Sequence, residues 1–135
     1  MLSTVMAAVV QVSMVGAQPM SYSDAYKLNE ETGKPLVVLI GADWCPACQV
    51  MKRTTMPQVA KDGVLGDVAF ATLDADRDGQ VATQMMKGGP IPQLLMFRKT
   101  ADGWKQERLI GAQSPAKVVA FLRRGIQAAA ERLGE

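Results

Sequence analysis

The two cysteines of the 135-residue chain, Cys45 and Cys48, are its clearest candidates for chemistry. A continuous apolar run, Leu36–Ile40, precedes them, and a segment of helical pattern follows. Cysteines at positions i and i+3 of a first helical turn lie close enough to form a disulfide. The free backbone N–H groups and dipole at a helix N-terminus favour a thiolate there. We therefore expect Cys45 to be an exposed, readily ionised nucleophile and Cys48 to be a buried resolving thiol.

Three other interpretations of the cysteine pair stay open. The pair forms an inert structural disulfide, although a bridge across so short a loop constrains the unfolded chain little. The thiols of two chains together bind a metal ion, or both cysteines are ordinary core residues. The strand, turn and helix pattern favours disulfide exchange, in which Cys45 attacks a substrate disulfide and Cys48 resolves the mixed disulfide.

Composition removes several other classes of site. The chain has no histidine, which excludes Ser-His-Asp triads, Cys-His proteases and zinc proteases of the H-E-x-x-H type. Gln49 follows the second cysteine, so the C-x-x-C-H motif of c-type haem attachment is absent. The formal charge of +2, from 15 basic and 13 acidic residues, does not indicate a nucleic-acid partner.

The order of predicted elements is that of an α/β protein with a mixed central β-sheet flanked by helices. Pro57 should end the helix that carries the cysteines, and Thr55 should cap a short second helix. The first two strands should form a right-handed βαβ unit. The first predicted helix starts from a cap at Ser21 or Ser23 and runs to about Thr32. The other predicted helices are 45–54, 55 onward, 80–87 and 115 onward, the last capped by Ser114. The predicted strands are 36–40, 68–73, 93–98 and 104–110.

The segment Ala42–Cys48, Ala-Asp-Trp-Cys-Pro-Ala-Cys, resembles the active-site segment of the thioredoxin superfamily. Gly89–Phe97 is similar to the segment that carries the cis-proline of that family, here Pro92, and Gly111-Ala112 before the last helix also matches. The resemblance spans Ser21 to Ile126. Trp-Cys-x-x-Cys followed by Ile-Pro some 45 residues later is a far more specific pattern than Cys-x-x-Cys alone.

The resemblance implies a thioredoxin fold and a thiol-disulfide oxidoreductase, with a reductase direction favoured. A cis peptide bond at Ile91–Pro92 would pack against the disulfide, Ile91 would offer its backbone to an extended substrate strand, and Trp44 would flank the site. No metal and no dissociable cofactor is implied, because the Cys45–Cys48 dithiol is itself the redox group. Partners would be protein disulfides and a membrane-bound or soluble thiol electron donor.

A second hypothesis is a thioredoxin-fold binding module without redox turnover. Such a module would act as a chaperone, or as a Cu(I) metallochaperone that uses Cys45, Cys48 and a nearby methionine. Replacing Cys45 by serine distinguishes the two hypotheses, since client binding by a chaperone would survive that change.

The sequence departs from thioredoxin in the surroundings of the second cysteine. Leu39 stands where thioredoxin has a buried aspartate, and Thr72 aligns with the lysine that pairs with it. The carboxylate thought to accept the proton of the resolving cysteine is therefore missing. Water and Asp43 are the candidates to accept the proton of Cys48 in its place.

The first 17 residues have the pattern of a cleaved secretory signal. No charged side chain precedes Asp24, the run Val5–Val15 is mostly apolar, and Val15-Gly16-Ala17 suits a signal peptidase. We expect residues 1–17 to be a signal peptide and residues 18–135 to be one thioredoxin-like domain, monomeric and exported to a bacterial periplasm or its equivalent. Without a signal at 1–17, a cytoplasmic location is expected.

One metal motif is half complete. Asp74, Asp76, Asp78 and Gly79 match the first half of a calcium-binding EF-hand loop, but Met85 occupies the position of its bidentate glutamate. We interpret this segment as a solvated loop between a strand and a helix.

Overall fold

A four-stranded mixed sheet forms the centre of the molecule. The computed structural model describes residues 18–134, and its strands lie in the order β2-β1-β3-β4. β1 pairs with β2 in parallel and with β3 antiparallel, and β3 pairs antiparallel with β4. This is the mixed sheet that the sequence predicts. The strands are β1 (Leu36–Gly41), β2 (Ala69–Asp74), β3 (Gln93–Thr100) and β4 (Gly103–Ile110).

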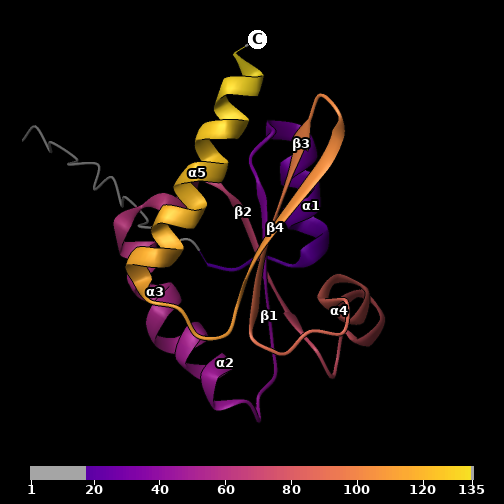
Figure 1. Ribbon diagram of the computed structural model, residues 1–135, viewed down its shortest axis with the longest axis vertical. Helices are drawn as coiled ribbons and strands as arrows, with labels where there is room; N and C mark the ends of the chain where they lie inside the picture. Colours follow the sequence, from indigo (N-terminus) through magenta and orange to yellow (C-terminus); the bar gives the residue numbers. More distant parts are fainter. Residues whose placement is uncertain (1–17, 135) are drawn as a thin grey trace, which may run out of the picture.

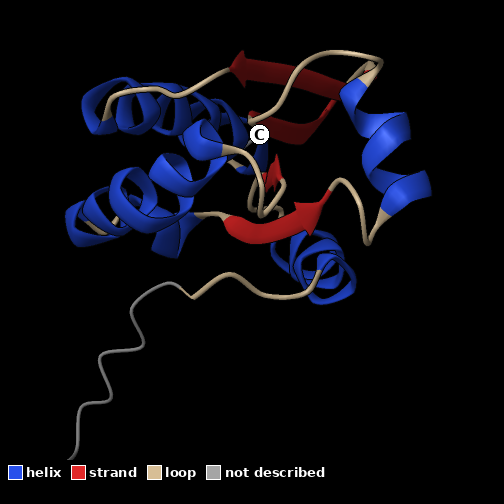
Figure 2. Ribbon diagram, turned by 90° about the horizontal axis from the view of Figure 1, so that it is seen from below, coloured by secondary structure: helices blue, strands red, loops and turns tan. Residues whose placement is uncertain are grey.

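Within residues 18–134, α-helices cover both faces of this sheet (Figures 1 and 2). One face is covered by α2, α3 and α5, and the other by α1 and α4. The connection from β1 to β2 through α2 and α3 forms the expected βαβ unit. The helices are α1 (Tyr22–Thr32), α2 (Pro46–Val50), α3 (Met56–Asp62), α4 (Gly79–Met86) and α5 (Pro115–Leu133).

The apolar run of β1 is buried on both faces of the sheet. Val37 and Leu39 belong to the cluster under α3 and α5, whereas Leu36, Val38 and Ile40 belong to the cluster under α1 and α4. Alternate side chains of a strand point to opposite faces, so a central strand needs apolar residues at every position. This burial fixes β1 in the centre of the sheet, with its carboxyl end free to carry the cysteines.

The helical chain that follows the cysteines is not broken at Pro57. Residues Met51–Thr55 form a π-helical turn between α2 and α3, and the backbone stays right-handed through Met56. The prediction of a break was therefore wrong, and so was the cap at Thr55. The wider turn accommodates the proline, whose missing N–H removes one helical hydrogen bond. The Thr55 hydroxyl instead donates to the Gln113 carbonyl at 3.4 Å.

The other ends of the helices follow local signals in the sequence. Ser21 caps α1 and Ser114 caps α5, each accepting a backbone N–H three residues on. α2 begins at Pro46, one residue later than predicted. α4 begins and ends one residue earlier than predicted. A 3₁₀ helix, Val64–Asp67, lies before β2 and was not expected. Within residues 18–134, no helix is long and apolar enough to cross a membrane.

Candidate active site

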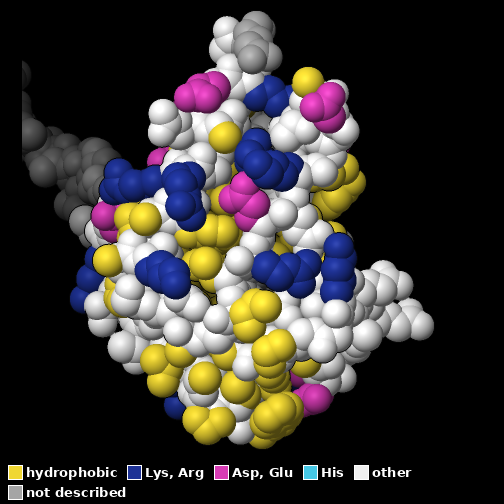
Figure 3. Space-filling model, in the orientation of Figure 1, with side chains coloured by type: hydrophobic (Ala, Val, Ile, Leu, Met, Phe, Trp, Pro, Cys, Tyr) yellow, Lys and Arg dark blue, Asp and Glu magenta, His cyan; other side chains and the backbone are white. Residues whose placement is uncertain are grey.

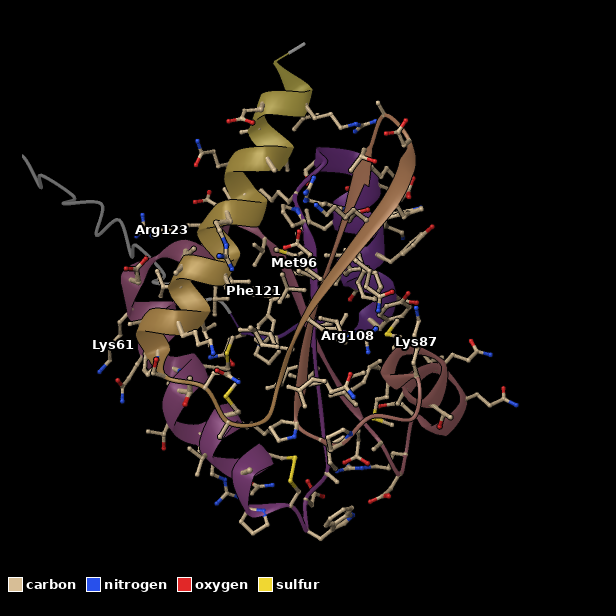
Figure 4. All side chains as sticks on the ribbon, viewed as in Figure 1. Lys61, Lys87, Met96, Arg108, Phe121 and Arg123 are labelled. Carbon is tan, nitrogen blue, oxygen red and sulfur yellow. A yellow bond between two sulfur atoms is a disulfide. The ribbon has the colours of Figure 1, made fainter. Side chains whose placement is uncertain are left out.

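Cys45 and Cys48 form a disulfide at the N-terminus of α2, just beyond the carboxyl end of β1 (Figure 4). Their Cα atoms are 5.2 Å apart. Cys45 is the N-cap residue of α2, and its Sγ accepts the backbone N–H of Cys48 at 3.3 Å. Pro46 occupies the first helical turn, where a missing N–H costs little. The donor and the helix dipole both stabilise negative charge at the first sulfur.

The two cysteines are almost equally buried. Cys45 is 6% exposed and Cys48 is 5% exposed, so the prediction of an exposed Cys45 was wrong. Ala42 and Ile91 pack around the pair and cover it. The difference between the two sulfurs lies in what they face. The Sγ of Cys45 lies 4.0 Å from the Ile91 carbonyl oxygen, and that of Cys48 faces the interior beside Gly41.

Trp44 lies on the surface next to the disulfide, with 69% of its area exposed. Its indole Nε1 donates to Asp76 Oδ2 at 2.9 Å, which ties the ring to the loop after β2. Sequence reasoning placed Trp44 at the site and missed Asp76. The signal was available, because the carboxyl ends of parallel strands meet at one edge of a sheet.

The loop before β3 completes the surface around the disulfide. The Ile91–Pro92 peptide bond is cis, as the resemblance implied. The Pro92 carbonyl accepts the N–H of Gly111 at 2.8 Å, and Gly111 has the left-handed φ of 83°. This bond fastens the loop to the end of β4, so that Ile91 lies over Cys45.

A pocket of about 360 Å³ lies beside Cys48, and Pro92 is among the residues that line it. Leu39 and Thr72, which are paired across β1 and β2, form part of its wall. Asp43 and Lys52 are among the residues that line it. Leu39 and Thr72 thus make this part of the wall uncharged, at the positions where thioredoxin has its aspartate and lysine. Charged side chains are found among the other residues that line the pocket.

Asp43, one candidate proton acceptor for Cys48, is engaged at the surface. Its carboxylate pairs with Arg77 at 2.8 Å, and both side chains are about 70% exposed. Arg77 also contacts Asp74 at 3.3 Å. Water in the pocket is the other candidate.

The acidic loop after β2 uses its carboxylates to hold its own backbone. Asp74 accepts the N–H groups of Asp76 and Arg77, each at 2.9 Å, and Asp78 accepts that of Asp74 at 2.8 Å. The backbone N–H of Arg77 in particular holds the pKa of Asp74 below its usual value. In residues 18–134 no group of three or more His, Cys, Asp or Glu side chains is placed to hold a metal ion.

Comparison with known proteins agrees with this geometry. The model of the thioredoxin-like family matches residues 18–99, which is more than half of the chain. The chain belongs to the thioredoxin-like family. The thiol:disulfide interchange protein DsbD of Ralstonia nicotianae is 26% identical to this thioredoxin-like chain over 105 residues. That match covers 76% of the chain, which spans only 17% of the length of the relative.

Solved structures show the same thioredoxin-like fold. A thioredoxin from Thermus thermophilus superposes with a TM-score of 0.66 at 23% identity, covering 81% of this chain and 86% of that one. The C-terminal domain of Neisseria meningitidis DsbD, in its reduced form, gives 0.53 at 24% identity, covering 75% and 89%. Family membership and the cysteine pair together support thiol-disulfide oxidoreductase chemistry in general.

Proposed function

We propose that this protein reduces disulfides in protein substrates by dithiol exchange through Cys45-Pro-Ala-Cys48. The observation that carries the proposal is the disulfide at the start of α2, where Cys45 Sγ accepts a helix N–H and faces the Ile91 carbonyl. A sulfur held in this way is the better nucleophile and leaving group of the two.

The reaction starts from the reduced protein. The Cys45 thiolate attacks one sulfur of the substrate disulfide, which forms a mixed disulfide and releases the first substrate thiolate. The Cys48 thiolate then attacks Cys45 Sγ, which re-forms the Cys45–Cys48 bond and releases the second substrate thiolate. The substrate gains two electrons. A thiol protein, soluble or membrane-bound, must return them to the pair by the reverse exchange, and no dissociable cofactor is needed.

The surface around the disulfide suits an extended peptide. Apolar side chains gather at the end of the molecule where β1 passes into α2 (Figure 3), and the exposed Trp44 and Val50 lie there. The backbone of Ile91 precedes Pro92 and lies beside Cys45. A substrate strand that pairs with this backbone would bring its disulfide to the Cys45 sulfur.

The metallochaperone alternative gains no support at the cysteines. The Cu(I) site considered from the sequence adds a nearby methionine, a soft ligand, to the two cysteines. Met51, one turn after Cys48, is 1% exposed and packs in the cluster under α3 and α5. Its Sδ accepts the N–H of Gln113 at 3.4 Å, so the sulfur is already engaged.

Serine variants of the two cysteines test the exchange reaction. We expect Cys45→Ser to reduce insulin disulfides only at the background rate, because the attacking sulfur is gone. We expect Cys48→Ser to accumulate a mixed disulfide with insulin, visible as an added mass, because resolution is lost. Lys61→Ser, an exposed change in the last turn of α3, is the control. Undiminished insulin reduction by Cys45→Ser would refute the mechanism, and retained client binding without turnover would favour the chaperone hypothesis.

We also propose that the protein acts after export, in the periplasm or an equivalent compartment. The proposal rests on the signal-like pattern of residues 1–17, which lie outside the described residues, and on the DsbD relative. Expression of the full chain in a bacterium should yield a periplasmic protein that begins at Gln18, as read by N-terminal sequencing. Recovery of an intact N-terminus in the cytoplasmic fraction would contradict export.

A further inference from the structure

The first residue after the cis-proline is a fully buried amide. Gln93 begins β3 and has 0% exposure, between Ile40 of β1 and Ile110 of β4. An unpaired amide in such a place is costly, so its hydrogen bonds matter. Its Oε1 accepts from Arg108 Nη1 at 2.9 Å, and its Nε2 donates to the Met86 carbonyl at 3.3 Å. The side chain therefore joins β3 to the end of α4.

Arg108 completes this junction from β4. Its Nη1 lies 3.3 Å from the Met85 carbonyl oxygen and 3.2 Å from that of Met86, the last two residues of α4. The final carbonyls of a helix lack intrahelical donors and carry partial negative charge, so a guanidinium is favourable there. No carboxylate pairs with Arg108 in the part of the chain that the structure describes. Figure 4 shows Arg108 between the sheet and α4.

The loop from α4 to β3, residues 87–92, bends back so that both of its ends contact the Arg108 and Gln93 side chains. Its first residues, Lys87 and Gly88, have positive φ values of 51° and 75°. The Gly89 N–H bonds the Met86 carbonyl at 3.1 Å, and a Cβ on Gly89 would overlap the Gln93 amide. The short remainder of the loop carries Ile91 and Pro92. The Arg108 guanidinium thus binds the carbonyls just before the loop and the Gln93 side chain just after it.

We propose that Arg108, acting through Gln93, is a positioning residue that holds the 87–92 loop in the shape that binds an extended protein substrate. This inference rests on the proposed function and adds a residue that touches neither the cysteines nor the substrate. Without the guanidinium, Gln93 Oε1 and the Met85 carbonyl lose this donor, and the Met86 carbonyl keeps only the N–H of Gly89 and the Gln93 amide. The loop then samples other shapes, and substrate binding must select the competent one.

The proposal predicts different effects of an Arg108 substitution on protein disulfides and on small-molecule disulfides. A protein disulfide needs the Ile91 backbone for binding as well as the sulfur for attack. A small aromatic disulfide, dithiobis(nitrobenzoate), needs little more than the sulfur. Loss of Arg108 should therefore weaken the use of insulin and spare the small disulfide.

The experiment compares Arg108→Met, which keeps an unbranched apolar stem without the guanidinium, with Arg108→Lys, which keeps the charge. We expect Arg108→Met to raise the KM for insulin about tenfold, the usual scale for a lost charge-assisted hydrogen bond, with kcat little changed. The rate with dithiobis(nitrobenzoate) should match that of the unchanged protein. Arg108→Lys should lie between the two. Arg124→Met, an exposed change on α5, should leave both substrates unaffected.

The following outcomes decide the inference. An insulin KM unchanged in Arg108→Met would overturn it, and so would an equal loss with both disulfides, which indicates a general defect. If Arg108→Met does not fold, the Lys variant decides: a raised KM with normal small-disulfide reduction supports the proposal, and a normal KM overturns it. An unchanged protein that reduces neither disulfide would refute the proposed function itself, and with it this inference.

Discussion

At the scale of single residues, the contact between Gly41 and Cys48 fixes the second sulfur. A Cβ built on Gly41 would lie 2.9 Å from Cys48 Cβ and 3.2 Å from its Sγ. Both distances are shorter than ordinary van der Waals contacts. The Cβ of Cys48 is attached directly to the helix backbone, so it cannot move away as the tip of a long side chain could. The last residue of β1 must therefore be glycine if Cys48 of α2 is to pack this closely against the end of the strand.

We predict that Gly41→Ala lowers the free energy of unfolding by about 1–3 kcal/mol, the usual cost of overpacking a buried site. It should also slow re-formation of the Cys45–Cys48 bond, because Cys48 is displaced. Chemical denaturation and the rate of oxidation by glutathione disulfide measure the two effects. Gly66→Ala is the matched control, since a Cβ there meets nothing within 4 Å. Equal stability of the two variants would contradict this packing argument.

The sequence predicts single residues at the site well where a motif carries them. The sequence assigns Cys45, Cys48, Trp44 and Pro92 to the site; the structure joins the two cysteines in a disulfide next to Trp44, and Pro92 lines the same pocket as Cys48. Burial of Cys45 was not predictable, because Ile91 covers it from a loop 46 residues away. Partners distant in sequence decide exposure, and a local pattern holds no information about them.

At the scale of elements, the loop from β2 to α4 is built on carboxylates that act as backbone acceptors. The N–H groups of Arg77 and then of Asp76 hold the pKa of Asp74 below 3.8. A carboxyl whose pKa is lower in the folded state stabilises the fold above its unfolded pKa. That stabilisation is lost as pH falls through the folded value.

We therefore predict that Asp74→Asn is less stable than the unchanged protein at pH 7, and that the gap closes below about pH 4. Asparagine keeps an acceptor oxygen but carries no charge at any pH. Thermal unfolding of both proteins from neutral to acid pH provides the measurement. Asp102→Asn, an exposed residue of the β3–β4 turn, controls for the loss of one negative charge. A gap that stays constant down to about pH 2 would show that the Asp74 charge is not its source.

Elements with strong local signals were the predictable ones. The apolar run of β1, the serine caps of α1 and α5, and the hairpin of β3 and β4 were all confirmed. The π-helical turn at Met51–Thr55 was not, because a proline signal normally indicates a helix end. Packing of Met51, Met56 and Val59 against the sheet keeps the chain helical through Pro57. Burial of these side chains outweighs the local preference of the residues before Pro57 to leave the helix.

At the scale of the whole molecule, the parallel pairing of β1 and β2 brings the site together. Both strands end at the same edge of the sheet, one followed by the cysteines and the other by the acidic loop. The Trp44–Asp76 bond and the Asp43–Arg77 pair join these two loops. The 87–92 loop closes the third side, held by Arg108 and Gly111. The fold class predicts this meeting of loops, but not the bonds between them.

The most direct test of the account is the equilibrium of the Cys45–Cys48 pair with a glutathione or thioredoxin couple. We predict that the pair exchanges reversibly as a two-electron couple, with a potential near the thioredoxin end of the scale, about −270 mV. A value near about −120 mV would contradict the reductase direction and make the protein a disulfide donor. A pair that did not equilibrate at all would contradict thiol-disulfide exchange itself.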